Sequence, residues 1–250
     1  MVLQSDYQPQ LLNSLEEKLE RLSLAGIDYC IVLDFTLEFA AQTAEEFIRN
    51  LLVRQWNVKK LLIGYDHRFG HNRAEGFEDY VRYGRTYGLS VIKARQYTEG
   101  NAAVSSSEIR RALSDANVEK AALLLTYPFT IRGTVVGGFR IGHEIGFPTA
   151  NILPDDARKI IPPIGVYAVW VYVDRQQYKG MLYIGRRPTV NNGDHVSYEV
   201  NILDFDKDIY NKHIVVSFMK YVRGDVKFES LDGLKVQLEK DREEVRQLLS

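Results

Sequence analysis

Residues Gly133 to Asn151 read GTVVGGFRIGHEIGFPTAN and carry the strongest structural signal in the chain. The stretch begins as a β-strand, opens into a loop with five glycines within fourteen residues, and closes on a proline followed by small oxygen-bearing side chains. Glycine lets a backbone bend tightly and approach a ligand closely. Backbone N–H groups in such a loop suit phosphate groups. The stretch therefore predicts a strand followed by a phosphate-binding loop.

Two side chains at the end of this stretch are candidate ligands for a metal ion. Thr149 and Asn151 are two residues apart, so they point to the same side of an extended segment. A hydroxyl and an amide oxygen are hard ligands, which suit a magnesium ion that nucleotide phosphates also hold. The glycines by themselves would equally fit a β-hairpin with a glycine-rich turn.

The whole string resembles the ATP- and metal-binding signature of riboflavin kinases, in which a glycine loop precedes the run GFPTAN. Here that run is Gly146–Asn151. The resemblance implies that Thr149 and Asn151 hold Mg²⁺, and that ATP is the co-substrate. For His143, exposure to solvent is an equally good interpretation. The residues that the resemblance assigns to ATP binding are Gly133, Gly138, Arg140, Gly142, His143, Gly146 and Pro148.

The composition is that of an ordinary globular protein, with 45% hydrophobic and 26% charged residues. The net charge of −1 and the pI of about 6.5 favour neither a nucleic acid nor an anionic membrane as partner. No apolar run approaches the roughly 20 residues that span a bilayer. The single cysteine, Cys30, lies in an apolar run and is predicted to be a buried packing residue. We therefore expect a cytoplasmic protein, and the oligomeric state stays open.

The first half of the chain alternates helix and strand patterns. Ser14–Glu17 and Thr43–Glu46 are capping boxes that predict helix starts, the second helix extending to about Val53. A further helix is predicted near 77–87. Strand–helix alternation of this kind implies an α/β unit with a mostly parallel sheet and helices on its faces. The predicted strands are 29–33, 60–65 and 89–93.

The second half changes character near residue 127. Several short β-rich runs with polar turns between them predict a small closed antiparallel barrel. The runs are 129–136, 166–173, 178–184, 197–203 and 214–221. An amphipathic helix from about Ser230 is predicted to pack on the barrel rather than bind a partner, through an apolar stripe of Leu231, Leu234, Leu238, Val245 and Leu248. We predict two domains, 1–126 and 127–250.

Phosphoryl transfer to an alcohol also needs a group that accepts the hydroxyl proton. Glu199 is the best candidate, because strand alternation sends it to the face opposite Tyr198 and Val200, where a carboxylate can act as general base. A glutamate in a strand could equally lie on a solvated face.

The order of motifs around Glu199 resembles that of riboflavin kinases. YIGRRPT at 183–189 precedes Glu199, and LDFDKDIY at 203–210 follows it. The resemblance implies that Glu199 is the base for the riboflavin 5′-hydroxyl, that Tyr210 and Arg223 contact the flavin, and that FMN is the product. Arg223 could equally be a surface cation. Asn211 stands where the family usually has glycine, a change beside the substrate that removes no catalytic group.

Residues 11–125 resemble the later part of the FMN adenylyltransferase domain that precedes the kinase barrel in many bacterial enzymes. GYDHRFG at 64–70 is similar to its GxDFxFG run, and SSSEIR at 105–110 to its SSTxIR run. Serine hydroxyls at a helix start followed by an arginine suit a triphosphate, although a serine-capped helix explains them too. The candidate nucleotide-binding residues are Asp66, Ser106, Ser107 and Arg110.

The early GxFDGxHxGH run of that domain has no counterpart in the 250 residues. The resemblance is therefore to a bifunctional riboflavin kinase/FMN adenylyltransferase without the start of its first domain. It implies that the first domain is an incomplete Rossmann-like nucleotidyltransferase α/β domain. We expect a riboflavin kinase of FAD biosynthesis that makes little or no FAD. The alternatives are a bifunctional enzyme whose second activity needs the missing segment, and a non-catalytic flavin-binding protein.

Overall fold

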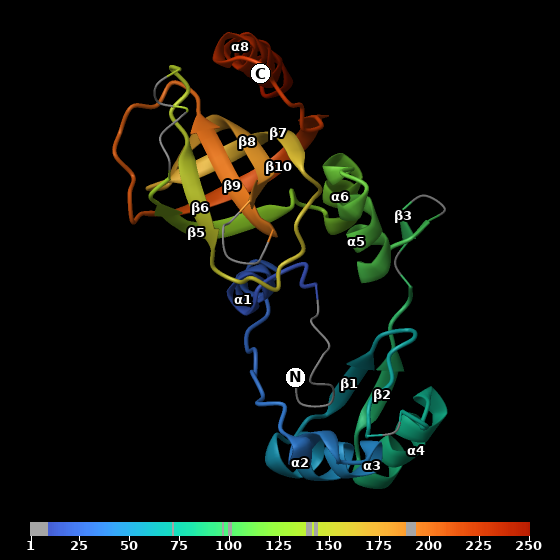
Figure 1. Cartoon of the computed structure of the whole chain (residues 1–250). Coiled ribbons are helices and arrows are strands. Elements are labelled where there is room, and N and C mark those ends of the chain that lie inside the picture. The colour runs from blue at the N-terminus through green and yellow to red at the C-terminus, as the bar shows by residue number, and fades with distance from the viewer. Residues whose placement is uncertain are drawn as a thin grey trace. The chain divides into compact units, whose positions relative to one another are not determined.

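The computed structural model describes residues 10–71, 73–96, 98–99, 102–138, 142, 145–188 and 194–250. The chain forms two compact units (Figure 1). The first unit spans Leu15–Val104, and the second comprises Gln10–Ser14 together with Ser105–Ser250. Within the described residues, no helix is long and apolar enough to cross a membrane.

The first unit contains a short parallel sheet joined by a helix, as the alternating patterns predict. Strands β1 (Lys60–Ile63) and β2 (Ser90–Lys93) pair in parallel, and α4 (Phe77–Tyr87) connects them. Gly88 ends α4 with a left-handed φ of 75°, a conformation that glycine adopts without strain. The other elements of this unit are α1 (Leu15–Leu24), α2 (Leu37–Ala40), α3 (Ala44–Glu46), the π-helix η1 (Phe47–Gln55), β3 (Thr98–Glu99) and β4 (Ala102–Ala103).

The capping box at Thr43 is confirmed. The Thr43 hydroxyl accepts the N–H of Glu46 at 3.2 Å, and the Glu46 carboxylate accepts the N–H of Thr43 at 2.9 Å. These reciprocal bonds satisfy N–H groups that have no partner inside the helix. The helix begins as α3 and continues into η1, which buries Ile48 and Leu52 against β1, α4 and the loop before β2.

The prediction of a buried strand at 29–33 is wrong. These residues have no regular secondary structure, Tyr29 is 90% exposed, and Cys30 is exposed as well. An apolar run becomes a buried strand only where a neighbouring strand pairs with it and another layer covers it. Within the described residues β1 and β2 form a sheet of two strands, so this run has neither.

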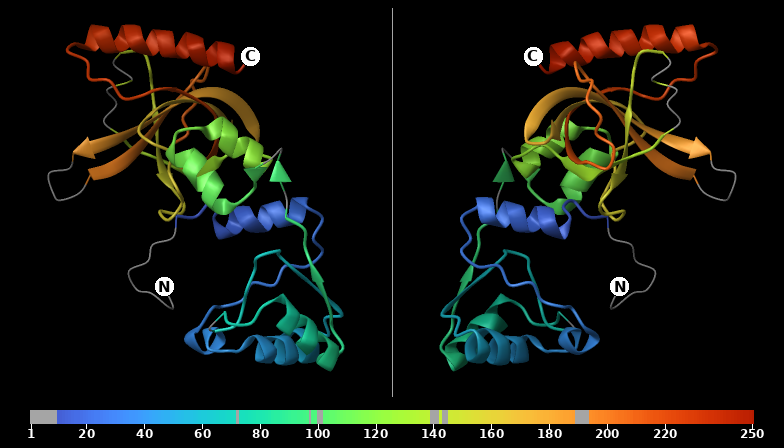
Figure 2. Two further views of the ribbon diagram at one scale, coloured as in Figure 1. Left: turned by 90° about the vertical axis from the view of Figure 1, so that its right-hand side faces the viewer. Right: turned by 90° about the vertical axis from the view of Figure 1, so that its left-hand side faces the viewer.

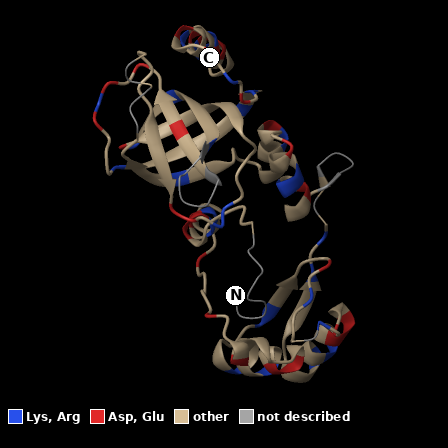
Figure 3. Ribbon diagram, in the orientation of Figure 1, with Lys and Arg blue, Asp and Glu red and all other residues tan. Residues whose placement is uncertain are grey.

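The second unit is built around a closed antiparallel barrel, as predicted, with strand order β10-β5-β6-β9-β8-β7. Figure 3 shows that charged residues are sparse on the strands and gather at their ends and in the loops. The strands are β5 (Thr130–Val136), β6 (Ala150–Pro154), β7 (Gly165–Val173), β8 (Gln176–Pro188), β9 (Asp194–Ile202) and β10 (His213–Arg223).

Large side chains pack part of the interior of the barrel. Tyr167, Phe129 and Phe218 are at most 1% exposed, and the ring of Phe218 contacts those of Phe129 and Tyr167 with centroids 5.8 and 5.2 Å apart. The Tyr167 hydroxyl donates a hydrogen bond of 2.6 Å to the carbonyl of Pro163, so its polar end is satisfied at the barrel edge. These three side chains therefore pack one part of the barrel interior.

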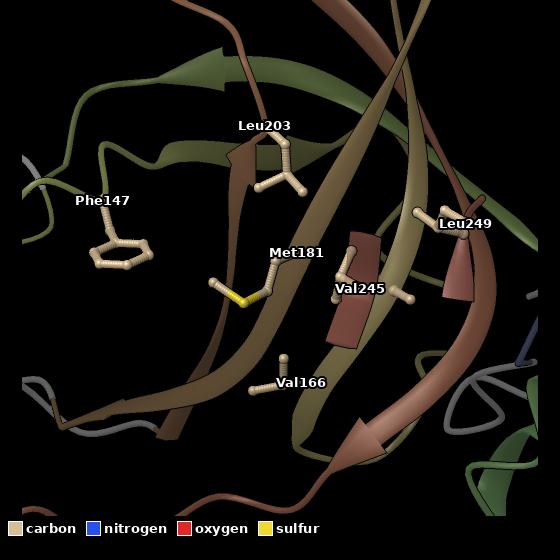
Figure 4. Packing of buried hydrophobic residues seen from close by; sticks show 7 residues of the cluster. Phe147, Val166, Met181, Leu203, Val245 and Leu249 are labelled. Carbon is tan, nitrogen blue, oxygen red and sulfur yellow. The ribbon is translucent and has the colours of Figure 1, made fainter. Parts of the chain in front are cut away.

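The C-terminal helix α8 (Leu231–Leu248) begins where predicted, and the Ser230 side chain caps it by accepting the N–H of Gly233. It lies across the outside of the barrel (Figure 2). Val245 and the following Leu249 pack with Phe147, Val166 and Met181, as Figure 4 shows. The predicted stripe is right at Leu238 and Val245, whereas Leu231 is 59% and Leu248 is 36% exposed.

Helices α5 (Ser106–Ser114) and α6 (Val118–Leu125) belong to the same compact unit as the barrel. Glu119 of α6 forms an ion pair of 3.5 Å with Lys220 of β10. The compact units thus divide near residue 105, earlier in the chain than the predicted domain boundary at 126/127. The domain boundary at 126/127 stays a prediction, because compact packing does not define a domain by itself.

Candidate active site

The central feature of the candidate site is a row of side chains that crosses neighbouring strands. Asn151 of β6 lies directly opposite Glu199 of β9, and Glu199 lies directly opposite Tyr183 of β8. Directly opposed residues in antiparallel strands point to the same face, with Cβ atoms about 4.5–5.5 Å apart. The candidate metal ligand and the candidate base are therefore immediate neighbours.

The row continues around the barrel to the candidate flavin contact. Tyr183 is in register with Val166 of β7, and Val166 with Arg223 at the end of β10. With strands about 4.8 Å apart, three strand spacings separate Glu199 from Arg223 by roughly 14 Å along the surface. Val166 packs under α8 (Figure 4), so the row lies on the outer face of the barrel.

Strand alternation explains why the row faces outward. The neighbours of Glu199 in β9, Tyr198 and Val200, are 5% and 0% exposed and point into the barrel. Glu199 itself is partly exposed. The sequence prediction that Glu199 takes the face opposite Tyr198 and Val200 is therefore confirmed.

The glycine loop packs closely against the two candidate metal ligands. A Cβ on Gly138 would lie 2.7 Å from Cγ of Asn151 and closer still to its Nδ2. A Cβ on Gly142 would collide with the Phe147 carbonyl and lie 3.5 Å from Oγ1 of Thr149. These two positions need glycine because the backbone passes directly over neighbouring atoms.

Further hydrogen bonds fix the GFPTAN run. Phe147 donates its N–H to the Gly142 carbonyl at 2.7 Å, and Gly146 supplies the positive φ of 83° that this turn requires. The Pro148 carbonyl accepts a bond of 2.7 Å from the side-chain amide of Asn201 on β9. Gly133 lies in β5, where a Cβ would collide with the Leu153 carbonyl of β6. Arg140 and His143, two of the predicted ATP contacts, lie outside the described residues.

A cavity of about 520 Å³ lies beside Thr149. Pro148 and Thr149 line one side, and the segment Phe205–Tyr210 lines another. The strand residues Val135, Ala150, Val200 and Ile202 complete the lining. This volume is in the range of small-molecule sites. Tyr210 thus shares a cavity with the candidate nucleotide residues. Asn151 and Glu199 do not line the cavity. Asn151 follows Thr149 by two residues in the chain, and Glu199 pairs with Asn151 across the strands.

Arg223 is partly buried and bound to a buried carboxylate. Its Nε and Nη2 donate three bonds of 2.7–3.0 Å to the Asp241 carboxylate on α8, and its Nη1 donates to the Gly224 carbonyl at 2.9 Å. Asp241 is 1% exposed and also accepts a bond of 2.8 Å from Gln237. The prediction that Arg223 contacts flavin took no account of this ion pair. The sequence did contain a signal for this ion pair, because Asp241 is an acidic residue within the apolar stripe of the last helix.

Tyr183 is a member of the row that the sequence did not reveal as a candidate. Its hydroxyl donates a bond of 3.0 Å to Asp225. Burial, the bond to Asp225 and the nearby charges of Asp225 and Glu199 raise the pKa of Tyr183 to about 12. The phenol is therefore a neutral donor at any physiological pH. Only the strand register, which the sequence does not show, brings it to Glu199.

The candidate adenylyltransferase residues fall in different compact units. Asp66 is exposed after β1 in the first unit, whereas Ser106 and Ser107 open α5 in the second. Arg110 donates from its Nε to the Gln10 carbonyl at 2.8 Å.

Comparison with known proteins agrees with the motifs. A family model described as riboflavin kinase matches residues 125–249, and one described as FAD synthetase matches residues 1–108. The bifunctional riboflavin kinase/FMN adenylyltransferase of Escherichia coli (strain K12) is 41% identical over 238 residues, which are 95% of this chain and 75% of the relative. The chain belongs to the bifunctional riboflavin kinase/FMN adenylyltransferase family.

A second relative and a solved structure also match most of the chain. The family member of Listeria monocytogenes serovar 1/2a is 35% identical over 241 residues, 96% of this chain and 75% of the relative. A crystal structure named macrolide-efflux protein, from Streptococcus pneumoniae, has a TM-score of 0.89 and 34% identity, and the match covers 98% of this chain and 79% of that chain. The fold of this riboflavin kinase/FMN adenylyltransferase family member is thus shared with a solved structure over nearly its whole length.

Proposed function

We propose that this protein transfers the γ-phosphate of ATP to the 5′-hydroxyl of riboflavin and so produces FMN. The observation that carries the proposal is the direct opposition of Asn151 and Glu199 on β6 and β9, in a barrel matched by the riboflavin kinase family. This arrangement puts a candidate metal ligand and a candidate base side by side on one surface.

The nucleotide binds along the glycine loop and the GFPTAN run. The cavity beside Pro148 and Thr149 supports this assignment, because it opens next to the loop and has room for a nucleotide portion. Tyr210 lines that cavity, so within this proposal it contacts the nucleotide side of the site and not only the flavin. The ATP contacts we assign are Gly133, Gly138, Arg140, Gly142, His143, Gly146 and Pro148.

Thr149 and Asn151 would hold the magnesium ion that accompanies ATP. Their hydroxyl and amide oxygens are hard ligands, and two such ligands suit an ion that takes its other contacts from phosphates and water. Within the described residues, no three His, Cys, Asp or Glu side chains gather as a metal site. When bound, magnesium neutralises charge on the phosphate oxygens.

Glu199 accepts the proton of the riboflavin 5′-hydroxyl. As the hydroxyl oxygen bonds to the γ-phosphorus, the bond from that phosphorus to the β–γ bridging oxygen breaks, and ADP leaves with FMN as the other product. A positioned general base contributes about 10²- to 10⁴-fold to such a step. We expect this activity in the cytoplasm, as the composition predicts.

The experiment is direct. The purified 250-residue protein is incubated with riboflavin, ATP and magnesium chloride, and FMN is separated by reversed-phase chromatography. Formation of FMN that depends on both ATP and protein supports the proposal. Binding of riboflavin, seen as quenched flavin fluorescence, without any FMN would reject it in favour of a non-catalytic flavin-binding protein.

A second candidate function is FMN adenylylation, since a model described as FAD synthetase matches residues 1–108. The 250-residue polypeptide nevertheless lacks the GxFDGxHxGH run whose histidines stabilise phosphate charge in that family. We therefore expect it to make little or no FAD from FMN, ATP and magnesium. Brisk FAD formation in the same chromatographic assay would establish the bifunctional alternative for this polypeptide.

A further inference from the structure

Helix α8 contacts three segments that surround the proposed kinase site. Asp241 binds Arg223, at the start of the flavin-side segment Arg223–Asp225. Arg242 lies over the ring of Phe147 in the GFPTAN run, with its guanidinium carbon 5.0 Å from the ring centroid. Arg246 forms an ion pair of 2.7 Å with Asp204, just before the segment that lines the cavity.

Of these three residues of α8, Asp241 is the most buried and makes the most hydrogen bonds. The Asp241 side chain is 2% exposed, and its two oxygens accept four hydrogen bonds, three from Arg223 and one from Gln237. The guanidinium in turn lies 5.9 Å from the ring centroid of Phe228. A planar guanidinium held by several bonds has one orientation, so the main chain at Arg223 is fixed as well.

Two residues after Arg223, this segment contacts the row of side chains that contains Glu199. The Gly224 carbonyl accepts a bond from Arg223, and Asp225 accepts the hydroxyl of Tyr183 at 3.0 Å. Tyr183 is directly opposite Glu199. A continuous path of hydrogen bonds, chain connectivity and strand pairing therefore runs from Asp241 through Arg223, Asp225 and Tyr183 to Glu199.

We propose that Asp241 is a positioning residue for riboflavin phosphorylation, which acts through Arg223 and Asp225 on the Tyr183 hydroxyl and so fixes the surroundings of Glu199 on the acceptor side. The inference rests on the proposed kinase function and deepens it. Asp241 touches neither substrate, and its effect is on how the acceptor hydroxyl is held rather than on nucleotide binding.

A double-mutant cycle tests this path. Asp241→Asn removes the charge that binds Arg223, and Tyr183→Phe removes the hydroxyl at the other end. Misplacement of a reacting group by small distances costs about 10- to 100-fold in rate, so each single variant is expected to lose about that much kcat for FMN formation, with KM for ATP unchanged. Because Asp241 acts through Tyr183, the double variant should be no slower than the slower single variant.

The matched control is Glu244→Gln, which removes an exposed carboxylate from the same helix and should leave kcat and both KM values unchanged. If Asp241→Asn does not fold, Asp225→Asn replaces it, because Asp225 is exposed and lies on the same path. Multiplicative losses in the double variant would overturn the inference, as would a rise in the KM for ATP that parallels the fall in kcat. A wild-type protein that forms no FMN would instead overturn the proposed function.

Discussion

Gly138 lies against Asn151 so closely that a Cβ at position 138 would be 2.7 Å from Cγ of the asparagine. Asn151 is 8% exposed and opposite Glu199, so it has little freedom to move away. The glycine of the loop and the amide of the candidate metal ligand therefore depend on each other sterically.

This contact predicts that Gly138→Ala lowers kcat/KM for ATP by at least about tenfold. The new methyl group would displace the Asn151 side chain, and small displacements of a positioning group lower the rate by about that factor or more. The adjacent Gly137→Ala is the matched control, since a Cβ there has no atom within 4 Å. Steady-state FMN formation measures both. Equal effects of the two substitutions would contradict a steric role for Gly138.

Glu199→Gln tests the base. The substitution preserves the size of the side chain and removes its ability to take a proton, so kcat should fall by about 10²- to 10⁴-fold. ATP binding, measured by calorimetry, should remain within a factor of about 2, which is about 0.4 kcal/mol by the usual affinity conversion. Glu239→Gln, on the exposed side of α8, is the control. A Glu199→Gln enzyme with unchanged turnover would remove Glu199 from the catalytic residues.

Thr149→Ala and Asn151→Ala test the metal ligands. Each removes one hard oxygen ligand, so the magnesium concentration for half-maximal activity should rise at least about tenfold. Mutating residues that only orient a metal ligand already lowers metal affinity by about 10- to 100-fold. Activity is measured across a magnesium titration at fixed ATP. Thr134→Ala, on the neighbouring strand β5, is the control. A loss of kcat at saturating magnesium, with no shift in the titration midpoint, would argue for a different role.

The Arg223–Asp241 pair predicts a large stability effect. Arg223→Ala leaves a buried carboxylate without its cation, which costs about 3–5 kcal/mol of unfolding free energy. Arg246→Ala breaks an ion pair whose side chains are 40% and 76% exposed, so it should cost no more than about 1 kcal/mol. Denaturant unfolding followed by far-UV circular dichroism measures both. Equal costs would mean that burial of Asp241 is not what makes its ion pair strong.

The sequence predicted the barrel well because its strands carry the signal that a barrel needs. The run Val166–Val173 is β-branched, aromatic or small throughout, and the structure places it in β7 with most of its side chains buried. The capping box at Thr43 was equally predictable, because it depends on residues three positions apart. Local patterns of this kind need no knowledge of the rest of the chain.

Other features depend on contacts between distant residues. The apolar run 29–33 has the composition of a buried strand, yet its burial depends on layers that the run itself does not encode. Tyr183 and Asp241 became candidates only through barrel register and helix docking, which bring together residues far apart in sequence. Glu199 and Asn151, by contrast, were found because short motifs contain them.

The alternation of side chains along β9 has one practical consequence. Tyr198 and Val200 point into the barrel, whereas Glu199 lies on the outer face with Asn151 and Tyr183. Under the proposed function, alternate residues of this strand serve folding and chemistry separately. A laboratory selection for a new alcohol acceptor can randomise the outward positions while the inward ones preserve a soluble scaffold.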